Sequence, residues 1–95
     1  MAVRRPPGVY AISVAADMVS MQVQNLRVYE RHGLVRPDRT AGGSRLYNAG
    51  DIERLERIRD LLAQGLNLAG VAEVLRLEAE NHRLREQVRR LRDAG

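Results

Sequence analysis

The sequence contains no cysteine, lysine, phenylalanine or tryptophan. The absence of cysteine excludes a disulfide framework and thiolate metal ligands, and only His32 and His82 offer an imidazole. We therefore expect neither a metal ion nor another cofactor. Because tyrosine occurs only three times, the core has to be built mainly from Leu, Val, Ile and Ala. Such a composition is typical of a small helical domain.

The chain is also short and has no long apolar run. Its 95 residues suffice for one domain with a modest core and leave no room for an added catalytic domain. The acidic residues at positions 51, 53, 56 and 60 have the spacing of a solvated helix face rather than of a catalytic site. No apolar segment reaches the length of a membrane span, and the basic opening lacks the core of a signal peptide. We expect a cytoplasmic protein that is not an enzyme and has no membrane partner.

Positive charge is concentrated in the first half of the chain. Residues 1–47 contain seven arginines and three acidic residues, whereas residues 48–95 contain nine of each. All sixteen basic residues are arginine, whose planar guanidinium suits bidentate contact with phosphate groups or guanine edges. A compositional bias of the genome would explain the preference for arginine equally well. It would not explain why the excess lies in one half.

The N-terminal segment predicts a flexible basic arm over residues 1–9, because Pro6-Pro7-Gly8 cannot start a helix. A short extended piece is expected at residues 10–12. Disorder is the preferred interpretation of the arm, and contact with a nucleic acid is the alternative.

Two short helices with a tight turn between them are expected next. Ser13 is a candidate N-cap for a helix over residues 14–19, and a second helix over residues 23–32 would end at Gly33. A helix-turn-helix needs a small residue at the helix contact, a tight corner and a core residue in the second helix. These positions hold Ala16, Ser20 and Leu26.

The following residues predict a β-hairpin wing. A strand at residues 34–35, a loop ending in Gly42-Gly43 and a strand at residues 44–47 form the pattern. Arg36, Arg39 and Arg45 are concentrated here, and a purely structural hairpin has no need of three guanidinium groups. Contact with phosphate is the simplest use for them.

The second half of the chain predicts two longer helices. Asn48 and Asp51 resemble a capping box that opens a helix to about residue 64, which Gly65 ends. Asn67 would cap a fourth helix, which no proline or glycine interrupts from residue 71 to residue 94. The expected inner face of the third helix consists of Ile52, Leu55, Ile58, Leu61 and Leu62.

The fourth helix carries a heptad stripe with charged flanks, which predicts a coiled-coil dimerisation helix over residues 76–95. Packing of a single amphipathic helix on its own domain is the alternative. Valine and one asparagine at the a positions, with leucine at d, would by themselves suggest a parallel pair. The stripe consists of Val74, Leu77, Asn81, Leu84, Val88 and Leu91.

Several of these motifs, in one order over residues 10–75, resemble the MerR family of bacterial transcription regulators, and within it the heat-shock repressor branch. The resemblance rests on the run at residues 26–30, Gly33-Leu34-Val35, Pro37, the phrase at residues 38–43, Arg45, Tyr47 and the run at residues 67–70. It implies a mainly α fold: a winged helix-turn-helix domain over residues 10–75 with a small β-hairpin wing, followed by the dimerisation helix. It also implies an antiparallel homodimer, associated with the nucleoid, that reads an inverted repeat in double-stranded DNA.

The resemblance assigns DNA contacts to Arg27 and Tyr29 in the second helix and to Arg45 and Tyr47 in the wing. Gln24 and Asn25 are added because side-chain amides pair with adenine edges. The full set of expected DNA-binding residues is Gln24, Asn25, Arg27, Tyr29, Arg31, Arg36, Arg39, Thr40, Gly43, Arg45 and Tyr47. Gln22-Val23 and Val28 depart from the residues common in the family, which puts the operator sequence in doubt.

The branch further implies a repressor of heat-shock and chaperone genes, with an Hsp70-type chaperone as co-repressor. Two alternatives remain. An excisionase-like protein that bends DNA shares the winged fold, and a protein-binding coiled-coil adaptor would need no DNA at all.

Overall fold

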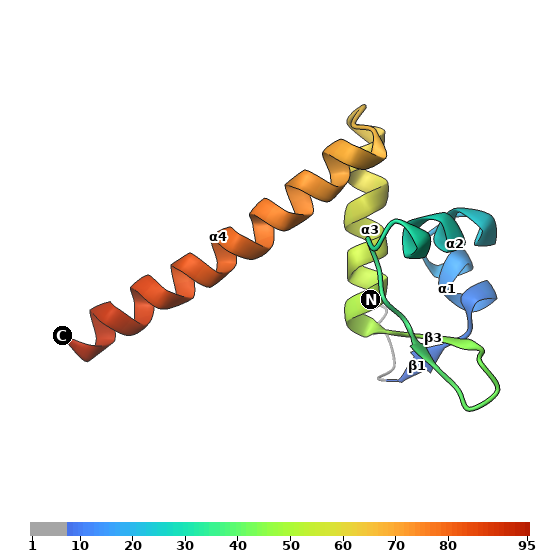
Figure 1. Ribbon diagram of the computed structural model, residues 1–95, viewed down its shortest axis with the longest axis horizontal. Coiled ribbons are helices and arrows are strands. Elements are labelled where there is room, and N and C mark those ends of the chain that lie inside the picture. Colours follow the sequence, from blue (N-terminus) through green and yellow to red (C-terminus); the bar gives the residue numbers. More distant parts are fainter. Residues whose placement is uncertain (1–7) are drawn as a thin grey trace, which may run out of the picture. The chain divides into compact units, whose positions relative to one another are not determined.

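The computed structural model describes residues 8–95, so the arm predicted over residues 1–9 lies almost entirely outside the described part. The chain divides into two compact units, residues 1–61 and residues 62–95. As predicted, the described residues are mainly helical with a small antiparallel sheet (Figure 1). The elements are β1 (Val9–Tyr10), α1 (Ile12–Met18), α2 (Val23–Arg31), β2 (Asp38–Arg39), β3 (Arg45–Asn48), α3 (Ala49–Ala63) and α4 (Leu68–Ala94).

The helix-turn-helix of α1 and α2 is confirmed, with one error at its start. α1 begins at Ile12 and not at residue 14, and its N-cap is Ala11, without a side-chain hydrogen bond. The predicted Ser13 cap is wrong because the extended Ala11 carbonyl already accepts from Ala15 N at 2.9 Å. The corner is formed by Ser20 with a φ of 56°. The expected stop of α2 is confirmed, since Gly33 follows it with a φ of 72°.

The sheet has the order β1-β3-β2, with both pairs antiparallel. The strand predicted at residues 34–35 is wrong, because Leu34 and Val35 are buried coil. Leu34 N donates to Tyr29 O at 2.9 Å in the cap of α2, and its carbonyl accepts from Arg54 Nε at 2.7 Å. Both the N–H and the carbonyl of Leu34 are therefore hydrogen-bonded to groups outside the sheet, so Leu34 does not pair with a neighbouring strand. The wing consists of β2, the loop 40–44 and β3.

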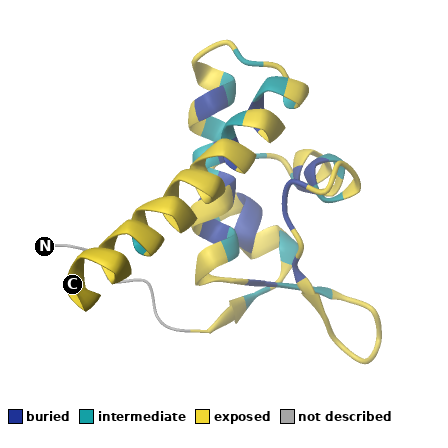
Figure 2. Cartoon of the chain, turned by 60° about the vertical axis from the view of Figure 1, so that its left-hand side comes forward, coloured by how far each residue is buried: buried dark blue, intermediate teal, exposed yellow. Residues whose placement is uncertain are grey.

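Most of the aliphatic core lies within residues 8–61, the described part of the first unit (Figure 2). Leu26, Ile52, Leu55 and Ile58 have no exposed surface, and Tyr47 of β3 is equally buried. The other buried hydrophobic residues of this unit are Ala15, Ala16, Val19, Tyr29, Leu34, Val35 and Leu61. The inner face predicted for α3 is confirmed at its four core positions.

The caps of the two long helices follow the sequence signals. Asn48 N donates to Asp51 Oδ2 at 3.0 Å, and Asp51 N donates to Asn48 Oδ1 at 2.8 Å, a reciprocal capping box. Asn67 Oδ1 accepts from Gly70 N at 2.8 Å at the start of α4. Both caps satisfy backbone N–H groups that have no partner within their helices.

α4 is one continuous helix of 27 residues. Its buried residues, Val71 and Leu75, lie in its first turns. Beyond them the apolar side chains are exposed: Leu77 by 50%, Leu84 by 46%, Val88 by 51% and Leu91 by 69%. No helix among residues 8–95 has the length and apolar character needed to cross a membrane.

Candidate nucleic-acid interface

The outer face of α2 is polar and basic. Gln24, Arg27 and Arg31 are exposed, and their spacing of three and four residues places them on one side of the helix. Leu26 and Tyr29 on the other side are buried. Asn25 is also exposed, next to this face. α2 therefore presents amide and guanidinium groups outward while its apolar side is fixed in the core.

The tip of the wing is a tight loop closed by Thr40. Thr40 N donates to Ser44 O at 2.8 Å, and Ser44 N donates to Thr40 Oγ1 at 3.1 Å. Gly43 N donates to Thr40 O at 2.9 Å, and Gly43 has a φ of 87°, which favours glycine. Thr40 and Gly43 thus shape the loop that follows Arg39. Arg36, before the wing, is exposed.

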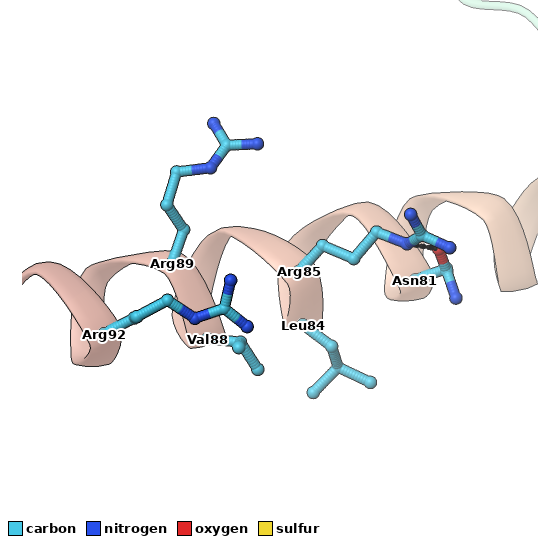
Figure 3. Close-up of a pocket in the computed structure, with 6 residues that line it drawn as sticks. All are labelled: Asn81, Leu84, Arg85, Val88, Arg89 and Arg92. Atoms are coloured by element: carbon cyan, nitrogen blue, oxygen red, sulfur yellow. Dashed lines mark hydrogen bonds between the residues drawn. The ribbon is translucent and has the colours of Figure 1, made fainter.

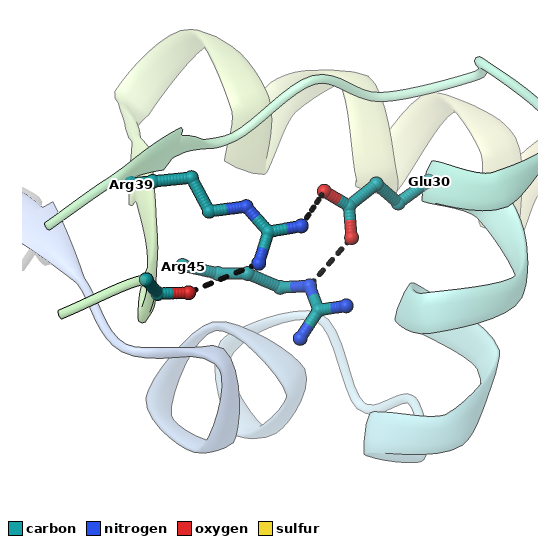
Figure 4. A network of polar contacts seen from close by, with 4 residues as sticks. Glu30, Arg39 and Arg45 are labelled. Carbon is teal, nitrogen blue, oxygen red and sulfur yellow. Dashed lines mark hydrogen bonds and ion pairs between the residues drawn. The ribbon is translucent and has the colours of Figure 1, made fainter.

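One carboxylate joins α2 to the wing. Glu30 Oε2 accepts from a terminal nitrogen of Arg39 at 2.8 Å, and Glu30 Oε1 accepts from Arg45 Nε at 2.5 Å (Figure 4). A second terminal nitrogen of Arg39 donates to the Gly43 carbonyl at 3.0 Å. We call Glu30, Arg39 and Arg45 the Glu30 cluster. It contains two guanidinium groups and one carboxylate and therefore carries one net positive charge.

The Glu30 carboxylate stays ionised in this cluster. Burial by itself would raise the pKa of Glu30, but the hydrogen bond and charge of Arg45 and the charge and hydrogen bond of Arg39 together outweigh it and lower the pKa. The Glu30 side chain is 18% exposed, compared with 46% for Arg39 and 25% for Arg45. The cluster is therefore partly shielded from water while Arg39 stays open to solvent.

The two tyrosines expected to contact DNA belong to the core. Tyr29 is 5% exposed and Tyr47 is fully buried. Burial raises the pKa of both hydroxyls, so both are neutral. The Tyr47 hydroxyl has no hydrogen-bond partner in the described chain. The structure therefore places the exposed candidates on α2 and the wing, and these two tyrosines beneath them.

Sequence reasoning missed three residues that organise this surface. Glu30 of α2 accepts hydrogen bonds from both wing arginines, Arg39 and Arg45. Arg54 and Arg59 of α3 hold the carbonyls of Leu34 and Val19, at 2.7 and 2.9 Å. Each contact joins residues at least nine positions apart, so no local pattern could have revealed it. Among residues 8–95 no group of three or more potential metal ligands occurs.

Comparison with known proteins identifies the family. The profile described as "MerR HTH family regulatory protein" matches residues 10–78. The chain belongs to the MerR family. Proteins of this family are DNA-binding transcription regulators and not enzymes.

Among curated MerR-family proteins, the chain is 51% identical over 71 residues to the "Putative heat shock protein HspR" of Streptomyces coelicolor, covering 74% of this chain and 47% of the relative. It is 42% identical over 72 residues to the regulator GlnR of Bacillus anthracis, covering 76% and 56%. It is 35% identical over 72 residues to the mercuric resistance operon regulatory protein of Shigella flexneri, covering 75% and 50%. The chain spans about half the length of these curated relatives.

Solved structures of MerR-family regulators share the fold. A regulator from Bacillus cereus superposes with a TM-score of 0.68 at 27% identity, covering 87% of this chain and 66% of that one. HiNmlR, described as a MerR-family regulator that lacks the sensor domain and is bound to promoter DNA, superposes with a TM-score of 0.64 at 19% identity, covering 88% and 76%. The winged helix-turn-helix with a long C-terminal helix is therefore confirmed as the fold.

Proposed function

We propose that the chain is a transcription regulator that binds an inverted-repeat operator in double-stranded DNA as a homodimer. The observation that carries the proposal is the pairing, in one unit, of an exposed polar face on α2 with an arginine-bearing wing. α2 has nine residues and is therefore about 13 Å long, comparable to the roughly 12 Å width of the major groove of B-DNA. Its relative HiNmlR is described as bound to promoter DNA.

The proposed contacts divide by chemistry. Gln24 and Asn25, near the start of α2, reach base edges, because an amide pairs with adenine through two hydrogen bonds. Arg27 and Arg31 on the same helix reach guanine edges or phosphates. In the wing region Arg36, Arg39 and Arg45 neutralise backbone phosphates, and the turn at Thr40 and Gly43 sets their approach. Tyr29 and Tyr47 support these groups from within the core.

Homodimer formation through α4 is supported by its exposed stripe. Leu84 and Val88 project to one side, while Arg89 is directed away from them (Figure 3). They line an open groove along the helix together with Asn81, Arg85, Arg89 and Arg92. Leu77, Leu84, Val88 and Leu91 are all at least 46% exposed in the single chain. A second copy of α4 would bury them, and the hydrophobic effect favours that burial.

Charge distribution along α4 favours the antiparallel orientation. Residues 68–80 contain three glutamates and one arginine, whereas residues 81–95 contain five arginines and two acidic residues. An antiparallel pair places the acidic half of each helix beside the basic half of its partner, and a parallel pair places like charges together. The stripe then forms three repeated layers in which Val74 meets Leu91 of the partner subunit, Leu77 meets Val88 of the partner subunit, and Asn81 meets Leu84 of the partner subunit.

Introduced cysteines test this orientation, because the chain has no cysteine of its own. Asn81→Cys and Leu84→Cys proteins are oxidised separately and as a mixture. In the antiparallel register only the mixture forms an intermolecular disulfide in high yield. Efficient cross-linking of Leu84→Cys with itself would indicate a parallel pair instead.

DNA recognition is tested by selecting from a pool of random duplexes with the chain. The expected product is an inverted repeat whose half-sites lie on one face of the duplex, as the two α2 helices of a dimer require. Arg27→Ala should enrich the repeat less strongly and with relaxed preference at the base pairs next to this residue, while Arg76→Ala, on the exposed face of α4, should enrich the same repeat as fully as the unaltered chain. An absence of DNA binding by the unaltered chain would leave a protein-binding adaptor as the better account.

We further propose repression of heat-shock and chaperone genes, with an Hsp70-type chaperone as co-repressor. The support is the 51% identity to a protein named as a putative heat shock protein. A chaperone that binds the DNA-bound form more tightly must raise operator affinity by the same factor. Titration of the operator with and without purified chaperone tests this, and an unshifted midpoint at saturating chaperone would contradict it.

A further inference from the structure

Arg39 and Arg45 are direct partners across the β2–β3 ladder. Residues opposite each other in an antiparallel pair point to the same face, and like charges in that position destabilise the pair. The two guanidinium groups nevertheless converge on one acceptor, since each oxygen of Glu30 takes a hydrogen bond from one of them. The carboxylate therefore removes the repulsion that the strand register creates.

Glu30 belongs to α2, the helix that carries the exposed Gln24, Arg27 and Arg31. The side-chain contacts of Glu30 with Arg39 and Arg45 therefore connect α2 to the wing. The connection continues to the tip of the wing, because Arg39 also donates to the Gly43 carbonyl at 3.0 Å. Arg45 uses Nε for Glu30, and its two terminal nitrogens are directed away from the carboxylate (Figure 4). A guanidinium held through Nε can still donate from its terminal nitrogens to another anionic group.

We propose that Glu30 is a positioning residue that fixes the two wing arginines relative to the outer face of α2 and so sets the specificity of DNA binding. The inference rests on the proposed function. A carboxylate near a phosphate backbone reduces non-specific attraction, since it cancels one of the charges that would displace counterions. It also orders two flexible side chains before DNA arrives, which lowers the entropy cost of the correct complex. Both effects raise the ratio of operator to non-operator affinity.

The test uses Glu30→Gln and its matched control Asp38→Asn. Asp38 is an exposed residue of the same wing, adjacent to Arg39, and its replacement also removes one negative charge. Each protein is titrated with an operator duplex and with a non-operator duplex. Glu30→Gln is expected to lower the affinity ratio about tenfold or more, because fixed phosphate contacts of the wing set the register in which α2 meets the base edges. Asp38→Asn is expected to strengthen both affinities by the same factor and leave the ratio unchanged.

An equal rise of both affinities in Glu30→Gln would overturn the proposal, because Glu30 would then act only as a charge.

Backbone NMR order parameters of residues 38–48 in the free chain provide a second measurement that needs no DNA. Glu30→Gln should lower them to loop values while those of α3 stay rigid, and an unchanged wing would also overturn the proposal. If Glu30→Gln does not fold, hydrogen exchange in the unaltered chain tests the proposal. The Nε–H of Arg45 should then exchange slowly with solvent, and fast exchange would contradict a fixed position of this side chain. If the unaltered chain binds no DNA, the proposed function fails while the order parameters still report on Glu30.

Discussion

Arg59 of α3 donates a terminal nitrogen to the backbone carbonyl of Val19, at 2.9 Å and across forty residues of sequence. Val19 is the C-cap of α1, and the last carbonyls of a helix have no partner within it. The guanidinium also lies at the end of the helix where a positive charge is favourable. The contact between Arg59 and Val19 therefore attaches α3 to the end of α1, where the turn of the helix-turn-helix begins.

Replacement of Arg59 by methionine should lower the free energy of unfolding by about 1–2 kcal/mol, because a hydrogen bond from a charged, half-buried donor is lost. Urea unfolding followed by circular dichroism measures this. Asp60→Asn is the control, since its ion pair with Arg59 is long at 3.6 Å and exposed. It should change the stability by less than about 0.5 kcal/mol. Equal effects of the two changes would contradict the assigned role.

A substitution of Ser20 is expected to stabilise the folded chain rather than to destabilise it. Its φ of 56° lies in the left-handed region, which costs a residue with a side chain about 1 kcal/mol. Ser20→Gly should therefore raise the melting temperature. Ser13→Gly is the same chemical change inside α1 and should destabilise by about 0.5–1 kcal/mol. A loss of stability in both variants would show that the Ser20 side chain contributes more than its backbone conformation costs.

The Glu30 cluster predicts a dependence of stability on pH. The folded-state pKa of Glu30 lies below its ordinary value of 4.5. The stabilisation that the ionised Glu30 carboxylate gives to the folded state is therefore complete above the unfolded-state pKa, and it is lost as the pH falls through the folded-state pKa. The unfolding free energies of the unaltered chain and Glu30→Gln should differ at about pH 6, and the difference should shrink as the pH falls below the ordinary pKa of 4.5 and through the folded-state pKa. A difference that stays constant over this range would contradict the ion pairs.

The exposed stripe of α4 predicts that Leu84→Glu yields monomers, because dimer formation would bury an unpaired carboxylate. Ala79→Glu adds the same charge to the same helix outside the stripe and should leave the dimer intact. Sedimentation velocity distinguishes the two states. Dimers of Leu84→Glu at the same concentration would show that the stripe does not form the interface.

Local signals in the sequence were sufficient for most elements. The capping pair Asn48 and Asp51, the Asn67 cap and the glycines at positions 33 and 65 each act over a few residues, and each has its predicted effect in the structure. The helical periodicity of α3 and α4 is long enough to be decisive. Family resemblance then gave the winged fold, which the comparisons confirm.

What the sequence did not predict depends on long-range contacts. Leu34 has the composition of a strand residue, but its carbonyl is taken by Arg54, twenty positions away. The pairing of β1 with β3 joins residues nearly forty positions apart. By its position in the helix, Glu30 would be assigned to the surface of α2, and only its contacts with Arg39 and Arg45 of the wing make it partly buried. The burial of Tyr47, likewise, follows from the position of β3 at the centre of the sheet.

The most direct test of the account is the salt dependence of DNA affinity, measured with the selected operator duplex for the unaltered chain and for Arg27→Ala. With Arg27, Arg36, Arg39 and Arg45 on each subunit and one of these charges cancelled by Glu30, a dimer neutralises about six phosphates, and log K should fall against log salt with a slope of about −5. Arg27→Ala should reduce the magnitude of the slope by about 2 per dimer and weaken binding by roughly 1–3 kcal/mol. An affinity that is nearly flat between low and physiological salt, or a slope that Arg27→Ala leaves unchanged, would contradict binding through α2 and the wing.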